Sequence, residues 1–121
     1  MANILIVDND LQFAKSIARV LKNGGFQTSI VTSGFEAGVS AVNLKPDLMT
    51  LDLQMPGMHG FQVLKAIRQI SELSDVKVLV VSAGSDQTLD SMRNYGADDV
   101  LQKPFDNENL ISKVNRLLDI S

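Results

Sequence analysis

The sequence predicts an α/β fold: a doubly wound parallel sheet of five strands in the order 2-1-3-4-5, with helices on both faces. Five short apolar segments alternate with five segments whose apolar residues recur at helical spacing, and this alternation is typical of parallel sheets. The chain has 121 residues, 45% of them hydrophobic, which suits one domain with its own core. Right-handed crossovers leave few topologies, and this strand order is the common one at this size. We therefore expect a single domain over residues 1–121.

The five predicted strands differ in how apolar they are. Residues 3–7 (NILIV) and 76–81 (VKVLVV) are almost wholly apolar, as strands buried on both faces are. Residues 26–31 (FQTSIV) are more polar, so we expect this strand nearer a sheet edge. The remaining strands are predicted at residues 47–51 (DLMTL) and 98–102 (DDVLQ). We expect the two acids that begin the last strand, Asp98 and Asp99, to be solvated.

The five predicted helices follow these strands in turn. The first covers residues 10–23 and is ended by a pair of glycines, and the second ends before Pro46. The fourth, residues 86–94, has only Leu89 and Met92 on its apolar side, so we expect it to be weakly held. The apolar positions that mark the second, third and fifth helices are Phe35, Val39 and Val42; Phe61, Leu64, Ile67 and Ile70; and Leu110, Val114 and Leu117. Phe35 and Phe61 are expected in the core.

Composition argues against several classes of protein. The net charge is −3, so we expect no nucleic-acid-binding surface on this domain, because phosphate binding needs clustered Lys and Arg. Apolar runs of four or five residues are too short to span a membrane, and the first ten residues do not resemble a signal peptide. We expect a cytoplasmic domain without membrane contact. The chain has no cysteine, which excludes disulfides, thiolate catalysis and cysteine metal sites.

Polar residues that could take part in a reaction follow four of the predicted strands. Asp8 follows the first strand, Asp52 the third, Ser82 the fourth and Lys103 the fifth. Doubly wound sheets bind ligands at the carboxyl ends of the strands, where the strand order reverses, so we expect these four side chains in one crevice. Each also has a simpler interpretation, such as a helix cap for Asp8 or Asp10 and a turn residue for Asp52. Those interpretations do not require four strand ends to act together.

Two carboxylates, a hydroxyl and an ammonium group in one crevice suit phosphoryl transfer. Carboxylate oxygens are the ligands that Mg²⁺ prefers, and an aspartate can act as a nucleophile that forms an aspartyl phosphate. The incoming phosphoryl group is anionic, so a metal ion and a lysine must neutralise its charge. A serine hydroxyl can then donate a hydrogen bond to a phosphoryl oxygen.

These residues resemble the receiver domain of bacterial two-component response regulators, the CheY-like family, which has a flavodoxin-like (βα)5 fold. The matching segments run through the whole chain: ILIVD, LDLQMPGMHG, VLVVSAG and LQKPF. The resemblance implies that Asp52 accepts a phosphoryl group from the phosphohistidine of a sensor histidine kinase, and that Ser82 and Lys103 contact this group. It also implies a Mg²⁺ site made by Asp8, Asn9, Asp52 and the backbone carbonyl of Gln54.

The resemblance further implies a switch and its partners. Phosphorylation would alter the face made by helix 86–94, strand 98–102 and the last helix, where a downstream effector domain or protein would bind and where a homodimer could form. The domain would catalyse only its own phosphorylation and dephosphorylation and would not be an enzyme otherwise. The bond between Lys103 and Pro104 is expected to be cis.

The sequence departs from the family pattern at two positions. The family usually has two consecutive acids after the first strand, and the second commonly contacts the metal; here this position is Asn9. An amide oxygen can bind Mg²⁺ but carries no charge, so we predict weaker binding. The family often has Tyr or Phe three residues before the lysine, whereas this chain has Val100. The usual coupling of the hydroxyl and aromatic movements is therefore in question, although Val100 could still repack.

Three alternatives remain open from the sequence. Asp8 and Asp10 resemble the D-x-D nucleophile motif of haloacid-dehalogenase-like phosphatases, although Leu11 replaces the expected Gly or Thr and no segment is long enough for a cap domain. A flavodoxin-like nucleotide binder would need a phosphate-binding loop where the chain has Asp8, Asn9 and Asp10. A receiver-like interaction module with weak or no phosphorylation is supported by Asn9.

Overall fold

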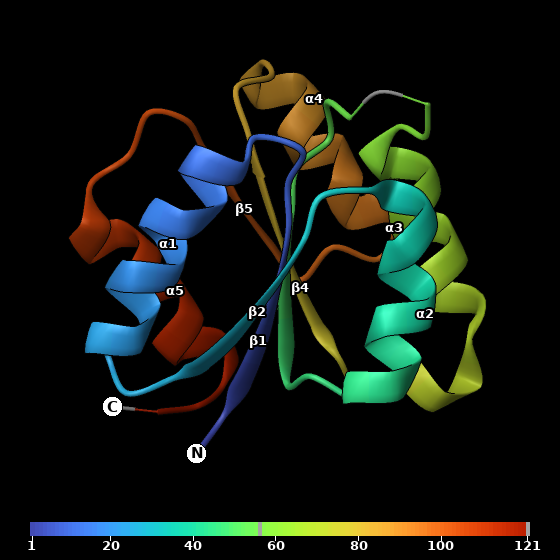
Figure 1. Cartoon of the computed structure of the whole chain (residues 1–121). Helices are drawn as coiled ribbons and strands as arrows, with labels where there is room; N and C mark the ends of the chain where they lie inside the picture. Colours follow the sequence, from blue (N-terminus) through green and yellow to red (C-terminus); the bar gives the residue numbers. More distant parts are fainter. Residues whose placement is uncertain (56, 121) are drawn as a thin grey trace.

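The computed structural model describes residues 1–55 and 57–120 and confirms the predicted α/β fold. Its sheet has five parallel strands in the order β2-β1-β3-β4-β5 (Figure 1). The strands are β1 (Asn3–Val7), β2 (Gln27–Val31), β3 (Leu48–Leu51), β4 (Lys77–Ser82) and β5 (Asp99–Gln102). The helices are α1 (Leu11–Asn23), α2 (Gly34–Leu44), α3 (Gly60–Gln69), α4 (Asp86–Ser91) and α5 (Asn107–Leu117), with short 3₁₀ turns η1 (Ser71–Leu73) and η2 (Met92–Tyr95).

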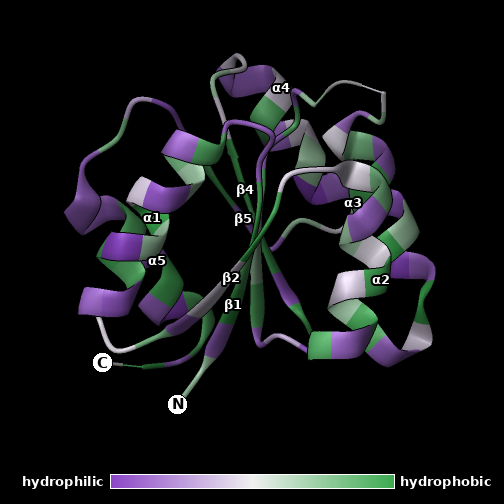
Figure 2. Cartoon of the chain, viewed as in Figure 1, coloured by the Kyte–Doolittle hydropathy of each residue, from purple (hydrophilic) through white to green (hydrophobic). Residues whose placement is uncertain are grey.

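The helices cover both faces of the sheet. α1 and α5 lie together on one face, while α2 and α3 lie on the other (Figure 1). β1 is apolar throughout because its side chains alternate between the two faces: Ile4 and Ile6 join the core under α1 and α5, and Leu5 and Val7 join the core under α2 and α3. In Figure 2 the apolar sides of the helices accordingly face the sheet. No helix among the described residues is long and apolar enough to cross a membrane.

The second helix packs with a different side from the one its large apolar residues predict. Phe35 and Val39 are 68% and 64% exposed, so the expectation that Phe35 belongs to the core is wrong. The buried side is instead made of Gly34, Ala37 and Ala41. Small residues let the helix backbone approach its neighbours closely, and a Cβ at Gly34 would lie only 2.9 Å from a methyl group of Val63 in α3. Close approach decided which side of α2 is buried.

The region from α4 to β5 also differs in part from the prediction. α4 ends at Ser91, and η2 continues it, while Leu89 and Met92 are buried as their apolar spacing predicts. Asp99 is only 7% exposed, so the expectation of a solvated residue is wrong for it. Its carboxylate is paired with Arg93 at 2.9 Å and with Lys113 at 3.2 Å. The ion pairs with these two partners offset the free-energy cost of burying the charged carboxylate.

Arg68 ties the end of α3 to the segments that enter β4 and β5. Its Nε donates a hydrogen bond to the carbonyl oxygen of Gly96 at 2.9 Å, and its Nη1 donates to that of Val76 at 2.7 Å. Its Nη2 forms an ion pair with Asp98 at 2.7 Å. The same Asp98 carboxylate accepts the amide of Val78 in β4 at 2.8 Å. Asp98 is exposed, as expected, and also has a structural role through these two contacts.

Candidate functional site

The structure brings together three side chains from three strand ends. Asp8 follows β1, Asp52 follows β3 and Lys103 follows β5. The Nζ atom of Lys103 lies 3.1 Å from Oδ2 of Asp8 and 3.8 Å from Oδ2 of Asp52. Both carboxylates are buried, with Asp8 2% and Asp52 6% exposed. Two buried acids therefore share one ammonium group at the carboxyl edge of the sheet.

Backbone hydrogen bonds hold these residues in register beyond the ends of the strands. The amide of Asp8 donates to the carbonyl of Val31 at the end of β2, and the amide of Asp52 donates to that of Val7 at the end of β1. The amide of Lys103 donates to the carbonyl of Ser82 at 2.8 Å. The parallel ladders thus continue for one more residue at each strand end, which explains why polar groups so distant in sequence converge.

Asp8 and Asp10 have separate roles. Oδ1 of Asp8 accepts the backbone amide of Asp10 at 2.9 Å, while Oδ2 faces Lys103. Asp10 is the N-cap of α1 and accepts the amide of Phe13 at 3.1 Å. The capping interpretation therefore holds for Asp10, and Asp8 is free of it. Asn9 lies between them with an exposed side chain.

The electrostatics of Asp52 combine opposing influences. Burial raises its pKa, the Lys103 ammonium lowers it, and the neighbouring Asp8 carboxylate raises it again. The amides of Gln54 and Leu53 also lower the pKa, and the net direction is upward from the usual value. Lys103 is therefore the main group that favours the ionised, nucleophilic form of Asp52.

Ser82 ends β4 beside the acids and is fully buried. Its Oγ accepts the backbone amide of Gly84 at 3.3 Å, so in this state the hydroxyl orders the loop that leads to α4. Because β3 and β4 are paired, with Leu51 opposite Val80, Ser82 belongs to the same sheet edge as Asp52. Ser82 thus lies at the pocket edge of the sheet, with its hydroxyl bonded to the loop before α4.

Lys103 has a further neighbour that sequence reasoning missed. Its Nζ atom lies 3.9 Å from the ring centroid of Phe13 in α1. Phe105 packs edge-on against that ring, with centroids 6.0 Å apart. The sequence marks Phe13 only as a member of the apolar stripe of the first helix, since its contact with Lys103 depends on the packing of α1 against the loop after β5.

Gly60 allows α3 to begin directly against the end of β3. Its amide donates to the carbonyl of Leu53 at 2.9 Å. A Cβ at this position would collide with the carbonyl oxygen of Asp52 and lie 2.6 Å from the Cα of Leu53. The glycine therefore lets the start of α3 lie close to the backbone of the candidate nucleophile.

The chain matches the family model described as response regulator receiver domain over residues 4–115. The chain belongs to the receiver domain family. It is 35% identical over 120 residues to the DNA-binding dual master transcriptional regulator RpaA of Synechocystis sp., covering 98% of this chain and 49% of that protein. It is 36% identical over 117 residues to the DNA-binding response regulator MtrA of Mycolicibacterium paratuberculosis, covering 95% of this chain and 50% of that protein. The chain thus spans about half the length of these curated relatives.

Solved receiver domains have the same fold. A response regulator receiver domain from Bermanella marisrubri is 41% identical, with a TM-score of 0.87, over 96% of this chain and 97% of that one. The chemotaxis protein CheY4 of Vibrio cholerae is 28% identical, with a TM-score of 0.89, over 97% and 98% of the two chains. The chain is therefore a receiver domain of two-component response regulators, and the phosphatase and nucleotide-binder alternatives lose their support. Such domains typically serve signalling.

Receiver domains generally bind Mg²⁺ at their acidic pocket, and the donors present here suit that ion. Asp8 and Asp52 could supply carboxylates, and the Asn9 amide and the Gln54 carbonyl could supply neutral oxygens. Mg²⁺ prefers oxygen ligands and keeps several waters, so it does not need a cage of acids. Within residues 1–55 and 57–120, no group of three or more His, Cys, Asp or Glu could hold a metal. Asp8 and Asp52 are the two candidate ligands that would carry charge.

His59, the one histidine of the chain, has a structural role in the receiver domain. It is the N-cap of α3, where its Nδ1 accepts the amide of Phe61 at 3.2 Å. The side chain of Gln62 accepts the amide of His59 in return at 3.0 Å, which completes a capping box. The two hydrogen bonds account for this histidine without a metal.

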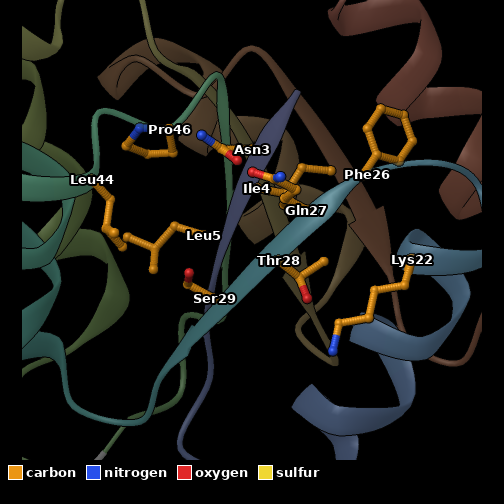
Figure 3. A pocket seen from close by; sticks show the side chains of 10 residues that line it. All are labelled: Asn3, Ile4, Leu5, Lys22, Phe26, Gln27, Thr28, Ser29, Leu44 and Pro46. Carbon is orange, nitrogen blue, oxygen red and sulfur yellow. The ribbon is translucent and has the colours of Figure 1, made fainter. Parts of the chain in front are cut away.

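A hollow also lies away from the acidic pocket (Figure 3). It follows the edge strand β2 and the amino-terminal half of β1, at the opposite ends of the strands from Asp8 and Asp52. Lys22 is the charged side chain in its lining, and the other polar groups include Asn3, Gln27 and Thr28. Among the described residues, this lining contains no acid, in contrast to the pocket of Asp8 and Asp52 at the other end of the sheet.

Proposed function

We propose that residues 1–121 act as a phosphoacceptor receiver domain in which Asp52 takes a phosphoryl group from the phosphohistidine of a sensor histidine kinase. The observation that carries this proposal is the buried carboxylate of Asp52, which lies 3.8 Å from the Lys103 ammonium and beside a second acid, Asp8. A carboxylate with a cation beside it can receive an anionic group that would otherwise be repelled.

The transfer exchanges one bond to phosphorus for another. An ionised Asp52 oxygen attacks the phosphorus atom and forms an O–P bond. The bond between phosphorus and the imidazole nitrogen breaks, and its electron pair stays on that nitrogen. The product is an acyl phosphate on Asp52. Lys103, already between the two acids, pairs with the new negative charge.

Mg²⁺ is the proposed cofactor, held by Asp8, Asn9, Asp52 and the backbone carbonyl of Gln54. When bound, it neutralises charge on the phosphoryl oxygens. Asn9 leaves this set one formal charge short of a pocket with two consecutive acids, so we propose weaker Mg²⁺ binding than in receivers that have both.

The proposed output is a change in the face formed by α4, β5 and α5. A phosphoryl group adds about −1.5 to −2 charges at neutral pH. If the Ser82 hydroxyl turns to donate to a phosphoryl oxygen, it gives up the amide of Gly84 and frees the loop before α4. α4 has six residues and is anchored mainly by Leu89 and, just beyond it, Met92, so a local change can shift its packing.

The partners of this face are proposed from the relatives. RpaA and MtrA are DNA-binding regulators about twice as long as the part that matches this chain, which supports a downstream effector as the partner. A homodimer through α4, β5 and α5 is a second use of the same face. The net charge of −3 supports a domain that does not itself bind nucleic acid.

Intact-mass spectrometry after incubation with acetyl phosphate and Mg²⁺ tests the proposal. We expect the mass of one phosphoryl group on the wild-type chain and none on Asp52→Asn. Asp47→Asn is the matched control, because Asp47 lies at the other end of β3 and accepts the amide of Asn3 at 2.8 Å. It should be phosphorylated normally. A phosphoryl group that persists in Asp52→Asn, or that peptide mapping places on Asp8, would refute the assignment. No modification of the wild type would favour an interaction module.

A further inference from the structure

Lys103 is held from three sides. Its Nζ atom lies 3.1 Å from Asp8, 3.8 Å from Asp52 and 3.9 Å from the centre of the Phe13 ring. A lysine has a flexible four-carbon stem, so its ammonium group stays in one place only where several groups attract it. The acids attract it from the pocket, and the aromatic face attracts it from the side of α1.

The structure assigns to Phe13 a positioning role: its ring face holds the Lys103 ammonium over the two carboxylates. This inference rests on the proposed function, since it concerns the lysine that pairs with the phosphoryl group. Phe13 acts through Lys103 and takes no direct part in the transfer of the phosphoryl group.

The ring is itself held in place. Phe13 lies in the first turn of α1, where its amide is bonded to the cap residue Asp10 at 3.1 Å. The rings of Phe105 and Phe13 form a T-shaped contact with an interplanar angle of 81°. Both rings pack against the core under α1 and α5. The loop after β5 therefore supplies both Lys103 and Phe105, the ring that packs against Phe13.

An aromatic ring stabilises the Lys103 ammonium at this position more than an aliphatic side chain of similar size would. Its face carries negative electrostatic potential, so it attracts a cation and at the same time excludes water from that side. With water excluded, the lysine charge acts more strongly on the acids.

The first test is an NMR spectrum of the full chain without any phosphate donor. The ring current of Phe13 should shift the Cε protons of Lys103 upfield, and the resonance is assigned by its loss in Lys103→Met. Phe13→Leu should abolish the upfield shift, and Phe13→Tyr should keep it. Ile17→Ala is the control for general damage to α1, since Ile17 is a buried residue one turn further along. It should leave the Lys103 shift unchanged. Unmoved Lys103 protons in Phe13→Leu would overturn the inference.

The second test is the rate of phosphorylation by acetyl phosphate with Mg²⁺. Phe13→Leu should slow it by about two- to fivefold, the ratio expected from losing about 0.4–1 kcal/mol of cation–π attraction. Phe13→Tyr should restore the rate, and Ile17→Ala should not reduce it at temperatures where the variant is folded. In a Lys103→Met background, Phe13→Leu should cause no further slowing, because it acts through the lysine. Equal slowing in both backgrounds would overturn the inference.

The two tests separate the inference from the function on which it rests. If the wild type takes no phosphoryl group, the proposed function fails, while the NMR spectra still decide whether Phe13 holds Lys103. If Asp52 is phosphorylated but the Lys103 Cε protons show no shift that depends on the Phe13 ring, the function stands and the role of Phe13 is refuted.

Discussion

Truncating Arg68 should destabilise the domain strongly, because one side chain joins three segments. Arg68→Ala removes hydrogen bonds of 2.9 Å to Gly96, 2.7 Å to Val76 and 2.7 Å to Asp98, and a weaker one of 3.4 Å to Leu73. Hydrogen bonds to charged groups contribute about 1.5–3 kcal/mol each. Water can reach the freed groups, so the contributions do not add fully. We expect a loss of about 2–4 kcal/mol in the free energy of unfolding.

Urea unfolding followed by circular dichroism measures this loss. With a slope of about 2 kcal/mol per molar urea, the midpoint should fall by about 1–2 M. Arg68→Lys should recover little, because an ammonium cannot reproduce the guanidinium fork. Lys65→Ala is the matched control: Lys65 lies in the same helix, exposed, with its Nζ 5.2 Å from the ring centre of Phe61. If Arg68→Ala costs no more than Lys65→Ala, the role given to Arg68 is refuted.

Three further predictions concern the pocket and its surroundings. Asn9→Asp should tighten Mg²⁺ binding about tenfold in an NMR titration, because it adds a charge beside the cation; an unchanged affinity would contradict the account. Burial opposes ionisation of Asp99, but the Val100 amide and two basic side chains outweigh it and leave its pKa lowered. Its contribution to stability is thus complete above the usual aspartate pKa near 3.9 and lost as pH falls through the lower folded value. Asp99→Asn should flatten this acid-induced loss in unfolding experiments, and an unaltered pH profile would count against it. Gly60→Ala should destabilise by about 1–3 kcal/mol, whereas Gly38→Ala, with open space around it, should not; equal stabilities would refute the close contact at Gly60.

Much of the site follows from sequence because few topologies suit the pattern. A strand such as β1 is continuously apolar only when both faces are covered, and parallel strands place their carboxyl ends at one edge. The meeting of Asp8, Asp52 and Lys103 could therefore be expected before any coordinates. The residues of the receiver pattern stand at those strand ends, so the family could be inferred from the same positions.

Other features depend on packing that periodicity does not contain. Phe35 and Val39 have helical spacing, yet close approach by Gly34 and Ala37 turned that side of α2 to solvent. From the sequence, Asp99 is expected at the surface. Its ion pairs with Arg93 and Lys113 allow it to be buried, and neither partner is adjacent to it in sequence.

The sequence by itself determined the strand order and which polar residues end each strand, because both follow from local patterns and chain connectivity. Only the tertiary structure decided which side of α2 is buried, how Arg68 joins α3 to β5, and that the ring of Phe13 lies over Lys103. These depend on distances between elements, which are set when all the side chains compete for the same space.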